Sequence, residues 1–311
     1  MRRRRGAPLT GHIPPVTPAF PIRLLALDLD GTLVGDDGIL GPETRRTVRE
    51  ALRRGVEVVL VSGRMPSSLR GYAEALGLRG PVVGHHGALI RLLPAPGEPG
   101  PGRLLKHRPL PAATARRLVA WARGRGFDVH ANHLERLILP AGHPRAEDYS
   151  AFLGAKAILV PDLEAALSHP VSKLLAVGDR EEVQKALAEA TATFAGQATA
   201  TISHPGFLEF VALGVSKGAA VRLLARRLGI PLSQVLAAGD QLNDLSMLQV
   251  VGHPAAVVTA PPEVQLAARY LVAPASEEGI AALLEAVVLP PPDEAARRGG
   301  TLASPAGPSQ G

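Results

Sequence analysis

The chain has 311 residues, of which 46% are hydrophobic, so it is long enough for two domains with apolar cores. It contains no cysteine, which excludes disulfides, zinc-thiolate sites and cysteine catalysis and fits a reducing compartment. Four charges of the net +6 belong to the arginines at residues 2–5, so the remainder carries about +2 (6 − 4). Aromatic residues make up only 3%, too few to stack against single strands. We therefore do not expect nucleic acid as the main partner, and a nucleic-acid role remains only as a weak alternative for the arginine-rich arm.

No apolar run approaches the roughly 20 residues that are needed to span a bilayer. The basic start is followed by prolines rather than by an apolar export segment. We therefore expect a cytoplasmic protein without membrane contact.

The first ninety residues alternate apolar runs with helical patterns. The predicted elements are a strand at 24–27, a helix at 43–54, a strand at 58–61, a helix at 66–76 and a strand at 82–83. Gly55 and Gly77 directly follow the two helical patterns, as glycines do at helix ends. This alternation predicts an α/β fold, with a doubly wound, mostly parallel sheet.

The middle of the chain predicts a second unit. Residues 93–103 are rich in proline and glycine and indicate a boundary. The elements predicted after it are a helix at 112–123, strands at 127–130, 136–139 and 173–177, and a helix at 180–189. The core pattern is expected to return near residues 208–211. This layout predicts a core domain at 22–90 and 205–288, an inserted α+β cap domain at 91–204, and a disordered arm and tail at 1–21 and 289–311.

Polar residues stand where the apolar strands end. Asp28 and Asp30 follow the first strand at once, and carboxylates so close together repel each other unless a cation or a proton intervenes. Ser62 and Gly63 follow the second strand, where a hydroxyl and a free amide can hold phosphate oxygens. Further along the chain, Lys217 begins a helix, and a late strand ends in Asp240 with Asn243 and Asp244 one turn later. Together these groups suit Mg²⁺-assisted phosphoryl transfer.

The four motifs, in this order, resemble those of the haloacid dehalogenase superfamily of phosphohydrolases, in its Cof-type subgroup with a large inserted cap. They are Asp28-Leu29-Asp30-Gly31-Thr32, Ser62-Gly63-Arg64, Lys217-Gly218 and Gly239-Asp240-Gln241-Leu242-Asn243-Asp244. The likeness extends from about residue 24 to about residue 284. It implies a Rossmann-like core, a cap that selects the substrate, and Mg²⁺ as cofactor.

The resemblance also implies roles for these residues. Asp28 would attack phosphorus and form an aspartyl-phosphate, and Asp30 would protonate the leaving oxygen and then activate water. The expected metal ligands are Asp28, Asp240 and the main-chain carbonyl of Asp30. Phosphate would be held by Ser62, Gly63, Lys217 and Asn243. Thr32 would stabilise the turn and Asp244 would orient Lys217 or a metal-bound water, although Asn243 and Asp244 could exchange roles.

Histidines mark the one departure from the family pattern and the main alternative site. His86 stands where the subgroup usually has asparagine, so a contact between core and cap or substrate is expected to differ. A zinc site at His130 and His133 is not expected, because the two side chains should point in different directions and no carboxylate is evident nearby.

Three functions are compatible with this sequence. The first is a phosphomonoesterase that acts on a small phosphorylated metabolite such as a sugar phosphate. The second is a phosphotransferase or phosphomutase that uses the same aspartyl-phosphate. The third is a non-catalytic regulatory binding protein on the same fold, whose usual sign would be the loss of Asp28, Asp30 or Lys217, and all three residues are present. The sequence predicts neither the substrate nor the oligomeric state.

Overall fold

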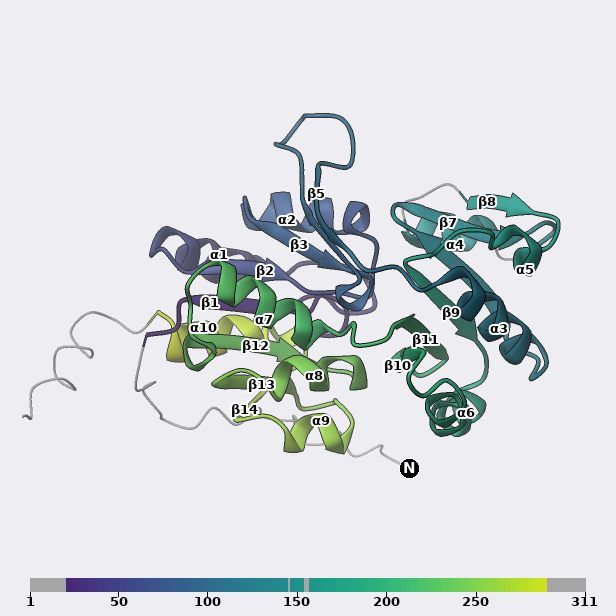
Figure 1. Ribbon diagram of the computed structural model, residues 1–311. Helices are drawn as coiled ribbons and strands as arrows, with labels where there is room; N and C mark the ends of the chain where they lie inside the picture. Colours follow the sequence, from purple (N-terminus) through teal and green to yellow (C-terminus); the bar gives the residue numbers. More distant parts are fainter. Residues whose placement is uncertain (1–20, 145, 154–156, 290–311) are drawn as a thin grey trace, which may run out of the picture.

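A computed structural model describes residues 21–144, 146–153 and 157–289, with the side chains of all but 151–153. The expected arm and tail lie outside the described residues, apart from Pro21 and Leu289. Two units lie side by side (Figure 1). Within the described part of the chain, no helix combines the length and the apolar character that crossing a bilayer requires.

The first unit is built on a five-stranded parallel sheet, which confirms the predicted fold class. Its strands, in spatial order, are β14 (Tyr270–Val272), β13 (His253–Val257), β12 (Val235–Gly239), β1 (Leu24–Leu27) and β2 (Glu57–Leu60). An antiparallel extension follows β2, and its strands are β3 (Pro81–Gly84), β4 (Leu89–Leu92) and β5 (Arg103–His107). A parallel bridge between Val61 and Val83 connects the two sheets.

Helices cover both faces of the parallel sheet, so its central strands are apolar on both sides. The helices of this unit are α1 (Pro42–Arg53), α2 (Arg70–Leu76), α7 (Lys217–Arg227), α8 (Leu245–Leu248), α9 (Pro262–Leu266) and α10 (Gly279–Val287). On β1, Leu25 and Leu27 pack into the core with α1, α2 and α10, while Leu24 and Ala26 pack against α7. This alternation explains why residues 24–27 form an uninterrupted apolar run.

The second unit is a six-stranded mixed sheet covered by helices. Its strands, in spatial order, are β10 (Ala198–His204), β11 (Phe207–Ala212), β9 (Lys173–Val177), β6 (Asp128–His133), β7 (Arg136–Pro140) and β8 (Ala157–Val160). Its helices are α3 (Ala112–Arg123), α4 (Ala146–Leu153), α5 (Leu163–Ala166) and α6 (Arg180–Thr193). Trp121 on α3 packs edge-on against Phe194 and Phe210 in this core.

The strands of the second unit divide their residues between two faces, and this division positions the site. Val129 and Ala131 of β6, with Leu174 of β9, join the apolar core against the helices. The residues between them on the same strands, such as His130 and Lys173, lie on the opposite face. That face carries polar side chains among apolar ones and lines a cavity shared with the first unit.

Two of the predicted boundaries are wrong in detail. Residues 93–102 connect β4 and β5 within one antiparallel hairpin, so the proline- and glycine-rich segment is a hairpin loop of the first unit. Residues 208–211 lie in β11, which pairs with β9 in the second sheet, so the return to the first unit comes later than expected. We therefore place the second unit between the start of α3 and the end of β11.

Candidate active site

Asp28 directly follows β1, at the carboxyl edge of the parallel sheet where open α/β folds place their ligands. Its N–H donates to the carbonyl of Ala238 on β12 at 3.0 Å, so the backbone there is fixed by the sheet. The chain then turns at Gly31, which has a φ of +79°. A Cβ on Gly31 would lie 2.2 Å from Oδ2 of Asp240, so only glycine lets the two loops approach.

Asp240 and Asp244 lie at the end of the neighbouring strand, β12. The 3₁₀ turn at Leu242–Asp244 returns Asp244 toward that strand end, where its Oδ2 accepts from the N–H groups of Asp240 at 3.1 Å and Gln241 at 3.0 Å. Oδ1 of Asp240 accepts from the Thr32 hydroxyl at 3.1 Å, which links the two loops. Thr32 thus contacts a carboxylate from the adjacent strand as well as lying in its own turn.

Lys217 is the first residue of α7 and is buried. Ser216 caps this helix, and its hydroxyl accepts from the N–H of Ala219 at 3.1 Å. The Lys217 ammonium donates to Oδ1 of Asp28 and to Oδ1 of Asp244, both at 2.6 Å. The ammonium of Lys217 is therefore shared between two carboxylates, Asp28 and Asp244, that follow different strands.

The three aspartates and the lysine form one buried cluster with a surplus of negative charge. Ligand oxygens of Asp28, Asp240 and Asp244 lie within 4.8 Å of one another. Burial, with the Asp244 charge, raises the pKa of Asp28 well above its usual range and raises that of Asp240 to about 7. Burial acts to lower the pKa of Lys217, but Asp244 and Asp28 outweigh it and raise that pKa. The cluster can hold a cation of the hard, oxygen-preferring class.

The Ser62–Gly63–Arg64 loop is held by backbone hydrogen bonds on both sides. The Ser62 N–H donates to Val83 at 2.9 Å, and the Ser62 carbonyl accepts from the N–H of His86 at 3.0 Å. The Ser62 hydroxyl oxygen accepts from the N–H of Arg64 at 3.1 Å, so the hydroxyl proton is available for another acceptor. A Cβ on Gly63 would lie 2.4 Å from the His86 ring, which makes glycine necessary here.

Asp30 does not join the buried carboxylates through its side chain. Its two carboxylate oxygens accept from Nε and Nη2 of Arg64, at 2.8 and 2.5 Å. The Asp30 side chain is 46% exposed and turns toward the cavity, whereas the cluster carboxylates are buried. The carboxyl group of Asp30 is thus oriented by a bidentate arginine, a partner that the sequence did not reveal.

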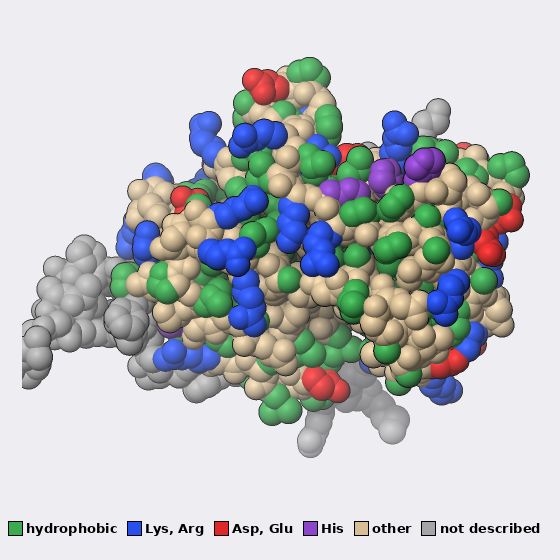
Figure 2. All heavy atoms as spheres, viewed as in Figure 1, with side chains coloured by type: hydrophobic (Ala, Val, Ile, Leu, Met, Phe, Trp, Pro, Cys, Tyr) green, Lys and Arg blue, Asp and Glu red, His purple; other side chains and the backbone are tan. Residues whose placement is uncertain are grey.

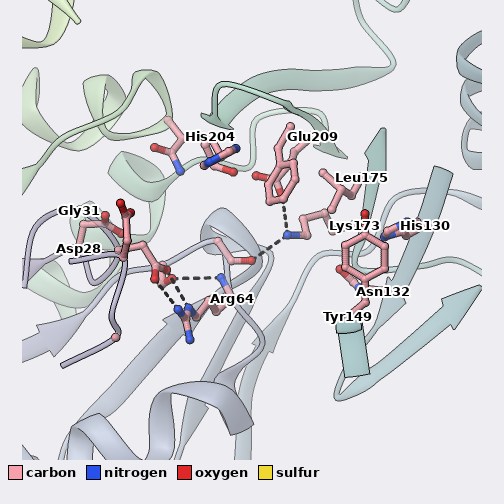
Figure 3. Close-up of a pocket in the computed structure, with 18 of the residues that line it drawn as sticks. Asp28, Gly31, Arg64, His130, Asn132, Tyr149, Lys173, Leu175, His204 and Glu209 are labelled. Atoms are coloured by element: carbon pink, nitrogen blue, oxygen red, sulfur yellow. Dashed lines mark hydrogen bonds and ion pairs between the residues drawn. The ribbon is translucent and has the colours of Figure 1, made fainter. Parts of the chain in front are cut away.

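A second buried network connects the two units behind the Ser62–Gly63–Arg64 loop. Lys173 on β9 donates to the Gly63 carbonyl at 2.9 Å and pairs with Glu209 on β11 (Figure 3). Glu209 also contacts Nε2 of His86 at 2.7 Å. The other ring nitrogen of His86, Nδ1, lies 3.2 Å from Nδ2 of Asn243, which donates to it, so Nε2 carries the proton shared with Glu209.

Asn243 therefore contacts a histidine, while its side chain also lines the cavity. The backbone at His85 and His86 has φ values of 47° and 57°, a left-handed conformation that costs free energy in a histidine. From this position the His86 imidazole reaches across to Glu209 in the second unit.

The sequence-predicted residues surround one cavity of about 620 Å³. The first unit contributes Asp28, Asp30, Ser62, Gly63 and Asn243, while Lys217, Asp240, Asp244 and Thr32 lie behind that wall. The second unit contributes a mixed polar and aromatic wall that includes His130, Asn132, Tyr149, Lys173, Phe207 and Glu209 (Figure 3).

Sequence reasoning missed Arg64, Lys173 and Glu209. The signal for the last two was a charged residue inside an apolar strand, since such residues are rarely buried unless they are paired. It was also wrong to expect no carboxylate near His130, because Asp128 contacts its ring at 3.1 Å. His133 does lie apart from His130, with its ring edge-on to His107.

Comparison with known proteins agrees with this geometry. The model of the haloacid dehalogenase-like hydrolase family matches residues 25–284. The chain is 28% identical over 247 residues to the HMP-PP phosphatase of Serratia proteamaculans, covering 78% of this chain and 86% of that protein. It is 26% identical to 5-amino-6-(5-phospho-D-ribitylamino)uracil phosphatase of Bacillus subtilis, over 86% of this chain and 96% of that one.

Solved structures show the same architecture. A haloacid dehalogenase-like hydrolase from Bacteroides thetaiotaomicron is 25% identical and superposes with a TM-score of 0.71, over 85% of this chain and 98% of that one. With the family match spanning most of the chain and the charged cluster at the strand ends, the protein belongs to the haloacid dehalogenase-like hydrolase family, as one of its phosphatases.

Proposed function

We propose that the protein is a Mg²⁺-dependent phosphomonoesterase that hydrolyses a small phosphorylated metabolite through a phosphoryl group carried on Asp28. The observation that carries the proposal is the position of Lys217. Its ammonium contacts Asp28 and Asp244 at once, behind the wall where Ser62 and Gly63 face the cavity. A buried cation beside a carboxylate at a sheet edge is suited to a dianionic phosphoryl group.

The chemistry divides between two aspartates. The Asp28 carboxylate forms a bond to phosphorus while the bond from phosphorus to the leaving oxygen breaks, and Asp30 gives that oxygen a proton. Asp30 then takes a proton from the attacking water, which releases inorganic phosphate and restores Asp28. The bidentate contact with Arg64 keeps the Asp30 carboxyl group in one orientation for both steps.

We assign the cation to Asp28 and Asp240, with the main-chain carbonyl of Asp30 as a third ligand and Asp244 next to them. These are hard oxygen donors, and Mg²⁺ needs few protein ligands because it keeps several waters. When bound, Mg²⁺ neutralises phosphoryl oxygens and lowers the cost of ionising the buried carboxylates. The raised pKa of Asp28 supports this assignment, because a carboxyl group with that pKa needs positive charge nearby to act as a nucleophile.

The substrate class follows from the volume and lining of the cavity. About 620 Å³ accommodates a small metabolite, and the wall from the second unit offers hydrogen-bonding groups beside aromatic rings. Relatives named for phosphorylated metabolites, HMP-PP and a phosphoribitylaminouracil, support a leaving group of that size.

A phosphate-release screen over phosphorylated metabolites tests the proposal. Turnover should require Mg²⁺, stop with chelator, and fall with Ca²⁺, whose larger and more flexible shell spoils in-line geometry. Inorganic phosphate should equal the substrate consumed. An isomeric or transferred phosphate ester as main product would instead identify a phosphotransferase. Phosphate binding without turnover of any substrate would identify a regulatory protein.

A further inference from the structure

Two histidines and an aspartate converge on one point in the wall of the second unit. Nε2 of His143 lies 2.7 Å from Oδ2 of Asp128, and Nε2 of His130 lies 3.1 Å from the same oxygen. The ligand atoms of all three residues lie within 4.8 Å of one another. From this convergence we propose that Asp128, His130 and His143 form a binding site for Zn²⁺ or a similar first-row transition metal, separate from the cluster at Asp28.

The donor set selects this class of ion. Two imidazole nitrogens and one carboxylate oxygen suit zinc and its neighbours, whereas Mg²⁺ prefers oxygen alone. In a tetrahedral shell with metal–ligand bonds of about 2.0–2.2 Å, donor atoms lie roughly 3.3–3.6 Å apart. The two separations from Asp128, 2.7 and 3.1 Å, are shorter than this, so the imidazoles need to move away from the carboxylate by only a few tenths of an ångström. Three protein ligands leave the fourth position for water or another ligand.

The scaffold holds the ligands rigidly. Asp128 and His130 are alternate residues of β6, an inner strand of the second sheet, so their side chains share the face turned toward the cavity. His143 comes from the segment between β7 and α4. The ring of Tyr149 on α4 packs edge-on against His130, with the centroids 4.2 Å apart, and also lies against His143, which restricts both imidazoles.

The two imidazoles of this site are buried, while its carboxylate is partly exposed to solvent. The side chains of His130 and His143 are 1% and 5% exposed, while that of Asp128 is 38% exposed. An ion can therefore enter beside the carboxylate and reach nitrogens that are shielded from competing solvent.

The site does not depend on the proposed phosphatase activity. An ion held there would join β6 to the segment before α4, and hence fix Tyr149, which lines the cavity. The ion would act on the shape of the substrate-facing wall rather than on the phosphoryl group.

Calorimetric titration with Zn²⁺ tests the inference. The full chain is stripped of metal and titrated in excess Mg²⁺, which occupies the Asp28 cluster. We expect one Zn²⁺ per chain, and at least about a 100-fold loss of affinity in His143→Ala, because a missing ligand costs more than a missing outer contact. Asp128→Asn should lose affinity similarly while keeping shape and hydrogen bonding, so it serves if His143→Ala does not fold.

His133→Ala is the matched control, because it removes an imidazole from the same strand but not from the site. It should bind Zn²⁺ as the wild type does, and metal-free thermal unfolding should show that each variant is folded. Replacing Zn²⁺ with Co²⁺ should give the visible absorption of a low-symmetry nitrogen and oxygen shell, and Asp128→Asn should abolish it. Zn²⁺ affinity equal in the wild type, Asp128→Asn and His143→Ala would overturn the proposal, as would no Zn²⁺ binding by the wild type.

Discussion

Two buried clusters of charged side chains lie on either side of the Ser62–Gly63 loop, and they differ in net formal charge. The cluster of Asp28, Asp240, Asp244 and Lys217 has three carboxylates and one ammonium, a formal charge of −2 when all are ionised (−3 + 1). The cluster between the units pairs Glu209 with Lys173 and a neutral His86, and its formal charge is zero.

The pKa directions follow this difference. Burial and neighbouring carboxylates raise the pKa of Asp240 to about 7. Burial also acts to raise the pKa of Glu209, but His86 and Lys173 outweigh it and lower that pKa. The Asp28 cluster thus carries uncompensated negative charge when ionised, whereas the Glu209 cluster is neutralised within the protein. These buried clusters are confined to two places, whereas on the surface shown in Figure 2 the Lys and Arg side chains are spread over both units.

The largest expected effect comes from Asp28→Asn. The asparagine keeps the size of the side chain but removes the nucleophile, so hydrolysis should fall by at least about 10³-fold. The metal-free protein should unfold at the same temperature or higher, because one of the repelling buried charges is gone. Steady-state kinetics and thermal unfolding measure the two effects.

Asp179→Asn is the matched control for this variant, since that aspartate is exposed and lies before α6 in the second unit. Its turnover should equal that of the wild type. Near-normal turnover of Asp28→Asn would contradict the assigned mechanism.

Glu209→Gln should destabilise the protein at the neutral cluster of Glu209, Lys173 and His86. The glutamine leaves the Lys173 ammonium buried without its counter-charge, so the free energy of unfolding should drop by about 3 kcal/mol. Mg²⁺ should not restore it, because the lost charge lies outside the cation site. Urea unfolding with and without Mg²⁺ measures both results.

The control for Glu209→Gln is Glu181→Gln, which breaks an exposed pair with Lys185 on α6. That change should be close to neutral, as solvent screens the pair. Equal stability of the two variants would show that the buried pair contributes little. Rescue of Glu209→Gln by Mg²⁺ would show that the clusters are coupled.

The stability of the metal-free protein should depend on pH through the unbalanced cluster. The pKa of Asp240 is about 7 in the folded state, against a usual 3.8. The folded state therefore binds this proton more tightly than the unfolded state, and the free energy of unfolding falls as pH rises from about 3.8 to about 7. From about pH 5 to about pH 8 the loss should be on the order of 2–4 kcal/mol. Mg²⁺ should therefore raise the melting temperature more at the higher pH.

Asp240→Asn should flatten the pH dependence and reduce the response to Mg²⁺. Thermal unfolding over the pH series, with and without Mg²⁺, provides the comparison. A Mg²⁺ effect of equal size at both ends of the series would place the cation away from these carboxylates.

The smallest expected effect is that of His86→Asn. The shorter amide cannot contact both Glu209 and Asn243, which costs about one hydrogen bond, or roughly 1 kcal/mol. Asparagine tolerates the positive φ at this position better than histidine does, and this partly offsets the loss. We expect a change in unfolding free energy below about 1 kcal/mol, measured by urea unfolding. A loss of unfolding free energy as large as that of Glu209→Gln would show that His86 is essential to the stability of the Glu209–Lys173 cluster.

The parallel sheet and the residues at its strand ends could be predicted, because local features encode them. The run at 24–27 is apolar throughout since both faces of β1 are covered, and Asp28 follows it immediately. The turn at Leu242–Asp244 likewise keeps Asp240 and Asp244 close in both sequence and space.

Partners that come from distant strands could not be predicted in the same way. Lys173 and Glu209 are 36 residues apart and meet only because β9 and β11 pair. His143 reaches Asp128 only through the packing of the second sheet. The strand pattern at 208–211 fits either sheet, because alternation specifies a strand and a buried face but not which neighbour it pairs with.

The bond from Lys173 to the Gly63 carbonyl has a consequence for movement between the units. A rotation that carries β9 away from the first unit would break this bond and expose to water a charged pair that is otherwise buried. Opening the cavity would thus hydrate the Lys173 ammonium and the Glu209 carboxylate, and closing it would require both groups to be desolvated again. The rate at which the cavity opens and closes should then depend on how readily water reaches this ion pair.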